Sequence, residues 1–232
     1  MIEFVFMLTR DDVTISDAAA VLRGVSGTGL RFIGFKDVGP PPAELREVTD
    51  AAHEAGLEVM LEVVSVSREE ELRSLSAARA IGVDWVLGGV HPHEGVEILE
   101  GVRYCPFAGT VEGHPSVLTG SIEAIAEHAA ELTSLPGVHG LDLLAYRHAT
   151  EDPVALTRAV AAASDGPVIA AGSVRSLQQI AELDAAGAWG FTIGSAIFDG
   201  RFPGAPSVPD QVASVLAMIE GSDPVATAGA ER

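Results

Sequence analysis

The sequence predicts an α/β protein built as a single-domain (β/α)8 barrel, and three observations support that prediction. Eight short apolar segments alternate with helical segments, a pattern typical of a parallel β/α architecture. The first apolar segment is followed by Thr9-Arg10-Asp11-Asp12, which lacks the glycine-rich turn that a doubly wound sheet places there. No linker divides the 232 residues, so we expect one barrel over residues 1–220 and a loose tail over residues 221–232.

Each predicted strand is a short apolar run that ends at glycine, proline or polar residues. The eight predicted strands span residues 2–9, 30–35, 57–64, 83–87, 102–107, 138–145, 168–171 and 189–193.

Capping residues and prolines mark the helices between these strands. Ser67 and Ser176 have capping-box spacing, and Asp152 precedes a proline that suits a first helical position. The predicted helices cover residues 16–24, 43–55, 67–82, 121–135 and 210–219, with two more that begin near Asp152 and Ser176. We expect loops at residues 91–93 and 108–120.

Composition excludes several classes of protein. The net charge of −19 and the absence of an obvious basic patch argue against a nucleic-acid partner. No apolar run approaches the length of a membrane span, and no secretory signal is visible at the N-terminus. The single cysteine, Cys105, rules out an internal disulfide framework and suits a reducing cytosol. We therefore expect a cytoplasmic protein that contacts neither nucleic acid nor membrane.

Two similar turns follow the last two predicted strands. Gly172-Ser173 follows residues 168–171, and Gly194-Ser195 follows residues 189–193, each opening a helical segment. Turns of this kind direct several backbone N–H groups at one point, which makes an anion site, above all for phosphate. The alternative is that both turns merely end their strands.

This segment resembles the last two β/α units of the ribulose-phosphate-binding TIM barrels. That superfamily includes the aminoimidazole-carboxamide ribotide isomerase of histidine biosynthesis, N-acetylmannosamine-6-phosphate 2-epimerase and several sugar-phosphate lyases. Their glycine turn after strand seven and their Gly-Ser-Ala turn after strand eight surround one phosphate. Here the corresponding residues are Gly172, Ser173, Gly194, Ser195 and Ala196. The resemblance implies that these turns bind the phosphate of a phosphorylated small molecule.

Lys36, the single lysine in the chain, is the leading catalytic candidate. Strand alternation puts Phe32, Gly34 and Lys36 on one face, so Lys36 is expected at the barrel mouth, where such barrels do their chemistry. A desolvated lysine can carry a proton or form an imine. The Ile33-Gly34-Phe35-Lys36 segment is similar to the strand-two lysine segment of the epimerases, in which the lysine moves a proton. A surface lysine or a salt bridge is the alternative.

Two carboxylates are candidates for the acid or base that works with Lys36. Glu62 points into the mouth if Val59, Leu61 and Val63 pack on the helices. Asp142 lies inside an apolar run, where a carboxylate must be paired or functional. A purely structural ion pair remains open for both.

Loop residues supply the remaining candidates. We expect Arg10, His91, His114 and Arg147 to bind substrate, with solvated loop side chains as the alternative. His91 and His93, with His114 or His148, have the residue types of a zinc site, but the favoured prediction includes no metal and no cofactor.

The chain departs from each named family at the catalytic positions. Ala171 stands where the epimerases carry a strand-seven glutamate. Thr9 and Phe107 lie near the places of the isomerase's paired aspartates, and strand three lacks the Asp-x-Lys of the orotidylate and ketogulonate-phosphate decarboxylases.

We therefore expect an enzyme that acts on a small phosphorylated sugar or related metabolite, by isomerase- or epimerase-type proton transfer next to a carbonyl. A Schiff-base aldolase or lyase using Lys36 and a non-catalytic phosphometabolite-binding barrel are the alternatives. Oligomeric state is open, with a homodimer as the expectation.

Overall fold

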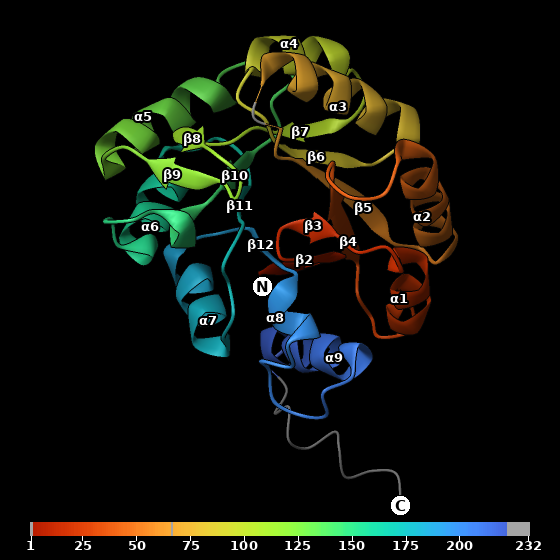
Figure 1. Ribbon diagram of the computed structural model, residues 1–232. Helices are drawn as coiled ribbons and strands as arrows, with labels where there is room; N and C mark the ends of the chain where they lie inside the picture. Colours follow the sequence, from red (N-terminus) through yellow and green to blue (C-terminus); the bar gives the residue numbers. More distant parts are fainter. Residues whose placement is uncertain (1, 66, 222–232) are drawn as a thin grey trace, which may run out of the picture.

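The computed structural model describes residues 2–65 and 67–221 and shows a (β/α)8 TIM barrel, which confirms the predicted fold class. Its parallel strands are adjacent in the order β10-β11-β12-β1-β4-β5-β6-β7 (Figure 1). Isolated parallel bridges join Tyr104 to Val138 and Phe107 to Asp142, and these close the barrel between β7 and β10. The barrel strands are β1 (Glu3–Met7), β4 (Phe32–Lys36), β5 (Glu58–Val63), β6 (Trp85–Gly88), β7 (Arg103–Cys105), β10 (Leu141–Leu143), β11 (Val168–Ala170) and β12 (Gly190–Ile193).

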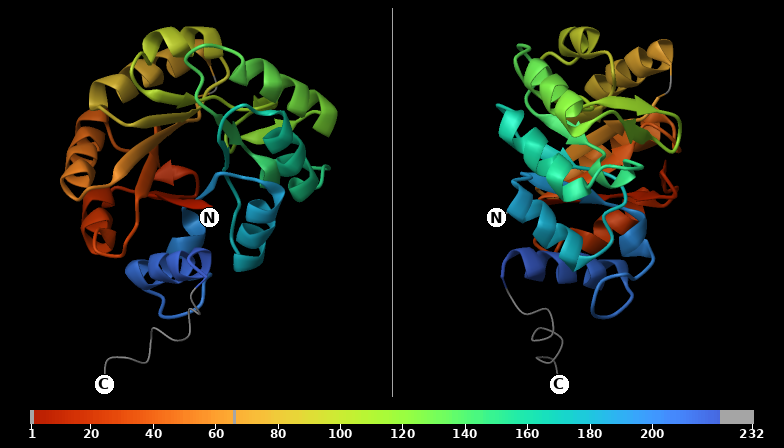
Figure 2. Two further views of the ribbon diagram at one scale, coloured as in Figure 1. Left: turned by 180° about the vertical axis from the view of Figure 1, so that it is seen from behind. Right: turned by 90° about the vertical axis from the view of Figure 1, so that its left-hand side faces the viewer.

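Helices surround the strands as an outer ring (Figure 2). The predicted caps form as expected: the side chains of Ser67, Asp152 and Ser176 accept hydrogen bonds from the N–H groups of Glu70, Ala155 and Gln179. The helices of the ring are α1 (Ala18–Val25), α2 (Pro42–Glu54), α3 (Arg68–Ile81), α4 (Pro92–Ile98), α5 (Ile122–Thr133), α6 (Pro153–Ala163), α7 (Leu177–Ala186) and α9 (Val208–Ile219). The short α8 (Ser195–Phe198) follows β12 directly, and the 3-10 turn η1 (Ala145–Arg147) follows β10.

The barrel interior is a packed core separate from the layer under the helices. Its apolar residues alternate along the strands with residues that face outward, as the pleat requires. Val59, Leu61 and Val63 belong to the outer layer, which leaves Glu62 on the inner face as predicted. The inner cluster consists of Val5, Met7, Phe32, Met60, Trp85, Leu87, Cys105 and Ile169, with Trp189 packed against it.

The segment after the first strand differs from the prediction. Thr9 was expected to end that strand, but β2 (Thr9–Arg10) instead pairs antiparallel with β3 (Val13–Thr14). The two residues between them, Asp11 and Asp12, have φ angles of 51° and 63°. Aspartate tolerates this left-handed region, and two such residues make the tight turn that suits a hairpin.

Two segments predicted to be loops contain regular structure. Residues 108–120 include an antiparallel hairpin, β8 (Thr110–Glu112) with β9 (Val117–Thr119), because Leu118 pairs with Val111 and is fully buried against the barrel. Residues 91–93 begin α4, since His91 is its N-cap and Pro92 suits the first helical position.

The remaining expectations concern membranes and the tail. Among the helices of the described residues, none is long and apolar enough to cross a membrane. Residues 222–232 of the predicted tail lie outside the described residues, so the division at residue 220 stays a prediction.

Gly140 allows β10 to approach β11 next to the closing bridges. A Cβ atom at this position would collide with the carbonyl oxygen of Pro167 and lie 3.2 Å from Sγ of Cys105. We therefore expect Gly140→Ala to lower the free energy of unfolding by about 1–3 kcal/mol, through overpacking. Chemical denaturation measures this.

Gly27→Ala is the matched control, because nothing lies within 4 Å of a Cβ built at Gly27. Its stability should stay within about 0.5 kcal/mol of the wild type. Equal stability of the two variants would contradict the tight packing assigned to Gly140.

Candidate active site

Lys36 ends β4 on the inner face of the barrel, where the sequence predicted it. Its side chain is only 5% exposed, and Nζ lies 2.7 Å from Oδ1 of Asp12 and 3.3 Å from Oε1 of Glu62. Gly34, two residues earlier, leaves space that the Met7 side chain occupies. The structure thus joins Lys36 and Glu62, which come from neighbouring strands, and adds a second carboxylate from the β2–β3 hairpin.

Asp12 is the site residue that the sequence reasoning missed. Its Oδ1 accepts hydrogen bonds from Lys36 Nζ and, at 2.6 Å, from Nη2 of Arg147, which follows β10. Burial alone would raise the pKa of Asp12, but the hydrogen bond from Arg147 and the Lys36 charge outweigh it and lower this pKa to about 2. The sequence pattern that could have identified it is Asp11-Asp12 between Thr9-Arg10 and Val13-Thr14, because two turn-forming residues between short strands are typical of a β-hairpin.

Two opposing effects set the charge state of Lys36. Burial by itself would lower the pKa of the ammonium, but the charges of Glu62 and Asp12 exceed that effect and raise the pKa above its ordinary value. Lys36 is therefore a cation at neutral pH in this site. An ammonium suits donation of a proton or stabilisation of a developing negative charge better than nucleophilic attack.

Asp142 lies below this ion network, at the inner face of β10. It is fully buried, and neither carboxylate oxygen has a hydrogen-bond partner within the described part of the chain. Burial, reinforced by the charge of Glu62, raises the pKa of Asp142 well above its usual range. A buried unpaired carboxyl group costs stability, so its presence points to a role in function.

The two Gly-Ser turns line the same cavity as Lys36. Gly172 and Ser173 have φ angles of 76° and 61°, and Gly194 immediately precedes α8. Among residues 2–65 and 67–221, the backbone N–H groups of Gly172, Ser173 and Ser195 meet no hydrogen-bond acceptor. Free N–H groups from two adjacent turns are the donors that a phosphate requires.

This cavity, about 330 Å³ in volume, opens at the C-terminal ends of the strands. Its lining is mostly polar and carries both signs of charge. The residues that line it are Met7, Thr9, Asp11, Asp12, Lys36, Glu62, Arg147, Gly172, Ser173, Val174, Arg175, Thr192, Ile193, Gly194, Ser195, Ala196, Asp199 and Arg201.

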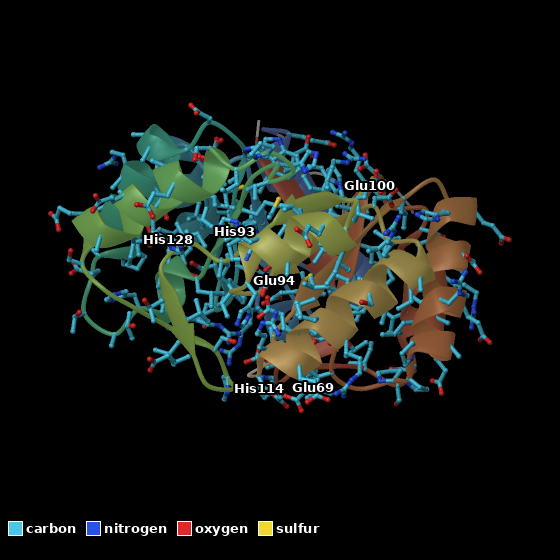
Figure 3. The ribbon with its side chains drawn as sticks, turned by 90° about the horizontal axis from the view of Figure 1, so that it is seen from above. Glu69, His93, Glu94, Glu100, His114 and His128 are labelled. Atoms are coloured by element: carbon cyan, nitrogen blue, oxygen red, sulfur yellow. The ribbon has the colours of Figure 1, made fainter. Side chains whose placement is uncertain are left out.

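Three of the predicted substrate-binding residues lie elsewhere. Arg10 is exposed and pairs at 3.2 Å with Asp199, which lines the polar cavity, but Arg10 itself does not line it. His91 Nδ1 lies 2.8 Å from Oε2 of the buried Glu71, beside α3. His114 lies in the β8–β9 hairpin, away from His93 on α4 (Figure 3). None of the three lines the polar cavity as described, and their role in substrate binding stays a prediction.

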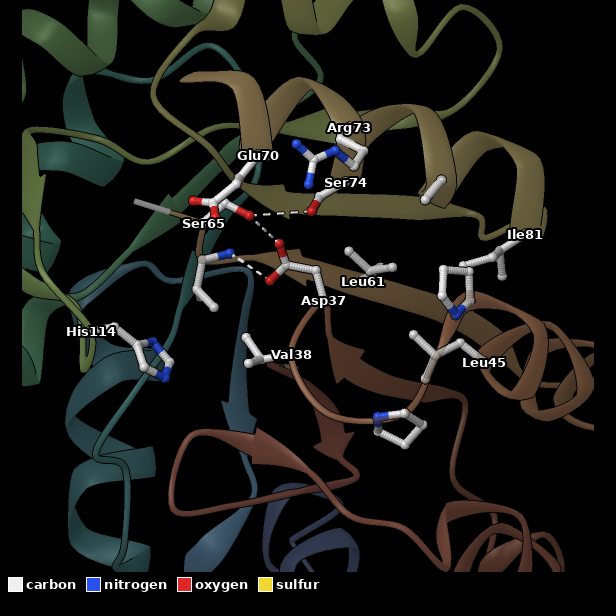
Figure 4. Close-up of a pocket in the computed structure, with 14 residues that line it drawn as sticks. Asp37, Val38, Leu45, Leu61, Ser65, Glu70, Arg73, Ser74, Ile81 and His114 are labelled. Atoms are coloured by element: carbon white, nitrogen blue, oxygen red, sulfur yellow. Dashed lines mark hydrogen bonds between the residues drawn. The ribbon is translucent and has the colours of Figure 1, made fainter. Parts of the chain in front are cut away.

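A larger cavity of about 490 Å³ lies between α2 and α3 (Figure 4). Its lining is mainly apolar, and the carboxylate of Asp37 is satisfied by the N–H of Val64 and the hydroxyl of Ser65. His114 lies at its edge. Because the smaller cavity holds the ion network and the free N–H groups, it is the candidate active site.

The histidines do not assemble into a metal site in the described part of the chain. Among those residues, no group of three or more His, Cys, Asp or Glu side chains could hold a metal ion.

The geometry defines a (β/α)8 barrel with a polar cavity at the C-terminal ends of its strands, and comparisons with known proteins show the same fold. A family model described as "Histidine biosynthesis protein" matches residues 151–203, which include both Gly-Ser turns. No curated protein sequence matches the chain. The chain has the fold of the ribulose-phosphate-binding barrels, which confirms the resemblance seen in the sequence.

Several solved structures share this fold. Orotidine 5′-phosphate decarboxylase from Pyrococcus horikoshii OT3 superposes with a TM-score of 0.66 at 15% identity, covering 94% of this chain and 99% of that one. Tryptophan synthase from M. tuberculosis gives 0.65 at 16%, covering 94% and 93%. A monomeric form of the dimeric phosphoribosylanthranilate isomerase from Thermotoga maritima gives 0.62 at 14%, covering 95% and 100%. At these identities the likeness defines the fold and leaves the reaction open.

We expect Asp142 to make the stability of the protein depend on pH. The folded state holds the Asp142 proton more tightly than the unfolded state, whose pKa is about 3.8. Relative to Asp142→Asn, the wild type should therefore lose about 1.4 kcal/mol of unfolding free energy per pH unit as pH rises above that value, until the folded-state pKa is reached. Urea denaturation of both proteins across this pH range measures the difference.

Asp165→Asn is the control, because Asp165 is exposed on the surface. It removes one surface carboxylate and provides the baseline with which the Asp142→Asn difference is compared at each pH. A pH-independent difference for Asp142→Asn would show that Asp142 titrates normally in the folded protein.

Proposed function

We propose that this protein is an enzyme acting on a small phosphorylated sugar or related metabolite, and that it transfers a proton next to a carbonyl group. One observation carries the proposal: the buried Lys36 ammonium, held by Asp12 and Glu62, shares a cavity with the free N–H groups of the two Gly-Ser turns. A phosphate on the turns would hold the carbon chain of the substrate against the ion network.

Each side chain has a distinct role in this proposal. Gly172, Ser173, Gly194 and Ser195 bind the phosphate through backbone N–H groups and hydroxyls. The carboxylate of Glu62 removes the proton from the carbon next to the carbonyl, and the resulting electron pair forms an enediolate.

The ammonium of Lys36 donates a hydrogen bond or its proton to the enediolate oxygen. In an isomerisation, protonated Glu62 returns its proton to the neighbouring carbon, and the hydroxyl that becomes the new carbonyl gives its proton to Lys36. In an epimerisation, a proton reaches the original carbon from the opposite face, and the enediol oxygen returns its proton to Lys36.

Asp142 and Arg147 complete the site. The raised pKa of Asp142 favours its protonated form, so it can act as a second proton donor beneath Glu62. Arg147 adds a fixed positive charge beside Gly172, where a Cβ atom would collide with its side chain.

The neighbours in structure support the substrate class. Orotidine 5′-phosphate decarboxylase and phosphoribosylanthranilate isomerase are named for phosphorylated compounds, and both superpose over nearly their whole length. Support for the phosphate assignment also comes from the family match, which covers the two turns.

A Schiff-base aldolase or lyase is less well supported. Imine formation needs a neutral amine, whereas Glu62 and Asp12 hold Lys36 in its charged form. Reduction with borohydride in the presence of ketose or aldose phosphates separates the two reactions: a covalent adduct on Lys36 would favour the imine route.

We expect phosphorylated sugars, but not their dephosphorylated counterparts, to raise the melting temperature. At a ligand concentration of 100 Kd the rise should be roughly 5–10 °C. Differential scanning fluorimetry over a panel of sugar phosphates provides the measurement, and assaying the binders for conversion separates an enzyme from a non-catalytic binding barrel.

Gly172→Ala should abolish this shift, because the added Cβ strains a left-handed residue and displaces Arg147. Gly29→Ala is the matched control, since Gly29 is also left-handed, with φ of 90°, but has open space around it. A shift that survives Gly172→Ala would place the phosphate elsewhere.

We expect Lys36→Arg to lower kcat/KM by roughly 10²–10⁴-fold on an identified substrate, because arginine keeps the charge but does not release a proton. The phosphate-dependent rise in melting temperature should remain. Full turnover by Lys36→Arg would exclude both the proton-transfer and the imine mechanism.

A further inference from the structure

We infer that Asp12 is a positioning residue that couples the phosphate-binding turn to Lys36 through the β2–β3 hairpin. The inference rests on the proposed function and adds to it a residue and a mechanical connection. Lys36 Nζ and Arg147 Nη2 both bind the same atom, Oδ1 of Asp12, at 2.7 and 2.6 Å. Because both cations bind one oxygen atom, Asp12 fixes the positions of the Lys36 and Arg147 side chains relative to each other.

The hairpin also holds the main chain of Lys36. The hydroxyl of Thr14 on β3 accepts a hydrogen bond from the Lys36 N–H at 2.8 Å and donates one to the Lys36 carbonyl at 2.9 Å. Thr14 is buried, so these bonds are shielded from water. The hairpin therefore binds Lys36 at two points: Thr14 hydrogen-bonds to its backbone, and Asp12 hydrogen-bonds to its ammonium group.

The tip of the same hairpin is fastened to the phosphate-binding turn. The N–H of Asp11 donates to Oγ of Ser195 at 3.0 Å. Thr9, at the start of the hairpin, packs so closely on Gly194 that a Cβ there would collide with it. A serine hydroxyl can accept one hydrogen bond while its own O–H donates to a phosphate oxygen. Ser195 can thus contact the phosphate and the hairpin with the same atom.

The turn residues favour a functional reading of this connection. Asp11 and Asp12 both adopt the left-handed conformation, which glycine or asparagine accommodates more readily than most residues. Only a residue with an acidic side chain in the second position can reach Lys36 and Arg147 with a carboxylate. The left-handed conformation of the two aspartates costs conformational free energy, and it places the Asp12 carboxylate between the two cations.

The single lysine of the chain makes the inference directly measurable. Selective labelling with ¹³C,¹⁵N-lysine gives one side-chain signal, that of Lys36, and its pKa follows from an NMR titration. The groups that face the ammonium are Asp12, Glu62 and Arg147, with Asp142 beneath them. Asp12→Asn should lower the pKa of Lys36 by about one unit or more, and Asp12→Glu should restore part of it.

Asp11→Asn is the matched control, because it removes the same charge from the same turn but its side chain does not contact Lys36. It should leave the pKa of Lys36 within about 0.3 units of the wild type. An unchanged Lys36 pKa in Asp12→Asn would overturn the inference. If Asp12→Asn does not fold, Asp12→Gly removes the same carboxylate at a left-handed position that glycine accommodates, and an unchanged Lys36 pKa in that variant overturns the inference in the same way.

Inorganic phosphate tests the coupling. Saturating phosphate should shift the Lys36 signal in the wild type, whereas in Asp12→Asn phosphate should bind within about threefold of the wild-type Kd and shift that signal by less than half as much. An equal shift in both proteins would overturn the coupling. Failure of phosphate to bind the wild type would contradict the phosphate site, while the pKa comparison would still decide whether Asp12 positions Lys36.

Discussion

The buried ammonium of Lys36 is the interaction on which the rest of the site depends. Removing a lysine from water costs several kcal/mol unless opposite charges compensate it. Asp12 and Glu62 supply that compensation, and Arg147 forms a second ion pair with Asp12. Asp12 belongs to the hairpin that follows β1, and Arg147 follows β10. The buried charge of Lys36 on β4 therefore connects β1, β4, β5 and β10 at the mouth of the barrel.

The two Gly-Ser turns and the ion network come from different strands, although they line the same cavity. The free N–H groups of the two Gly-Ser turns lie at the ends of β11 and β12, and the ion network lies across the mouth at the ends of β4 and β5. Under the proposed function, the phosphate turns and the proton-transferring residues lie on different strands, so either set can change without the other. Ala171 lacks a carboxylate, and the acidic groups come instead from β5, β10 and the β2–β3 hairpin.

Charge is organised locally, against the overall charge of the molecule. The chain carries a net charge of −19, yet the polar cavity is lined by as many cations as carboxylates. The cations are Lys36, Arg147, Arg175 and Arg201, and the carboxylates are Asp11, Asp12, Glu62 and Asp199. Cations and free backbone N–H groups attract an anion more strongly in a confined cavity than in bulk water, because the local dielectric constant is lower. The net negative charge of the chain is therefore compatible with the proposed phosphorylated substrate.

The sequence by itself determined the barrel, the helix caps, the two Gly-Ser turns at the ends of β11 and β12, and the inward direction of Lys36 and Glu62. These features follow from local patterns: alternation along a strand, capping residues and glycine turns. Only the tertiary structure decided that Asp12 pairs with Lys36, because that contact joins residues 24 positions apart through a hairpin turn of two left-handed aspartates. The tertiary structure also determined the charge of Lys36. Burial lowers its pKa and neighbouring carboxylates raise it, so the positions of these carboxylates in space decide which effect prevails.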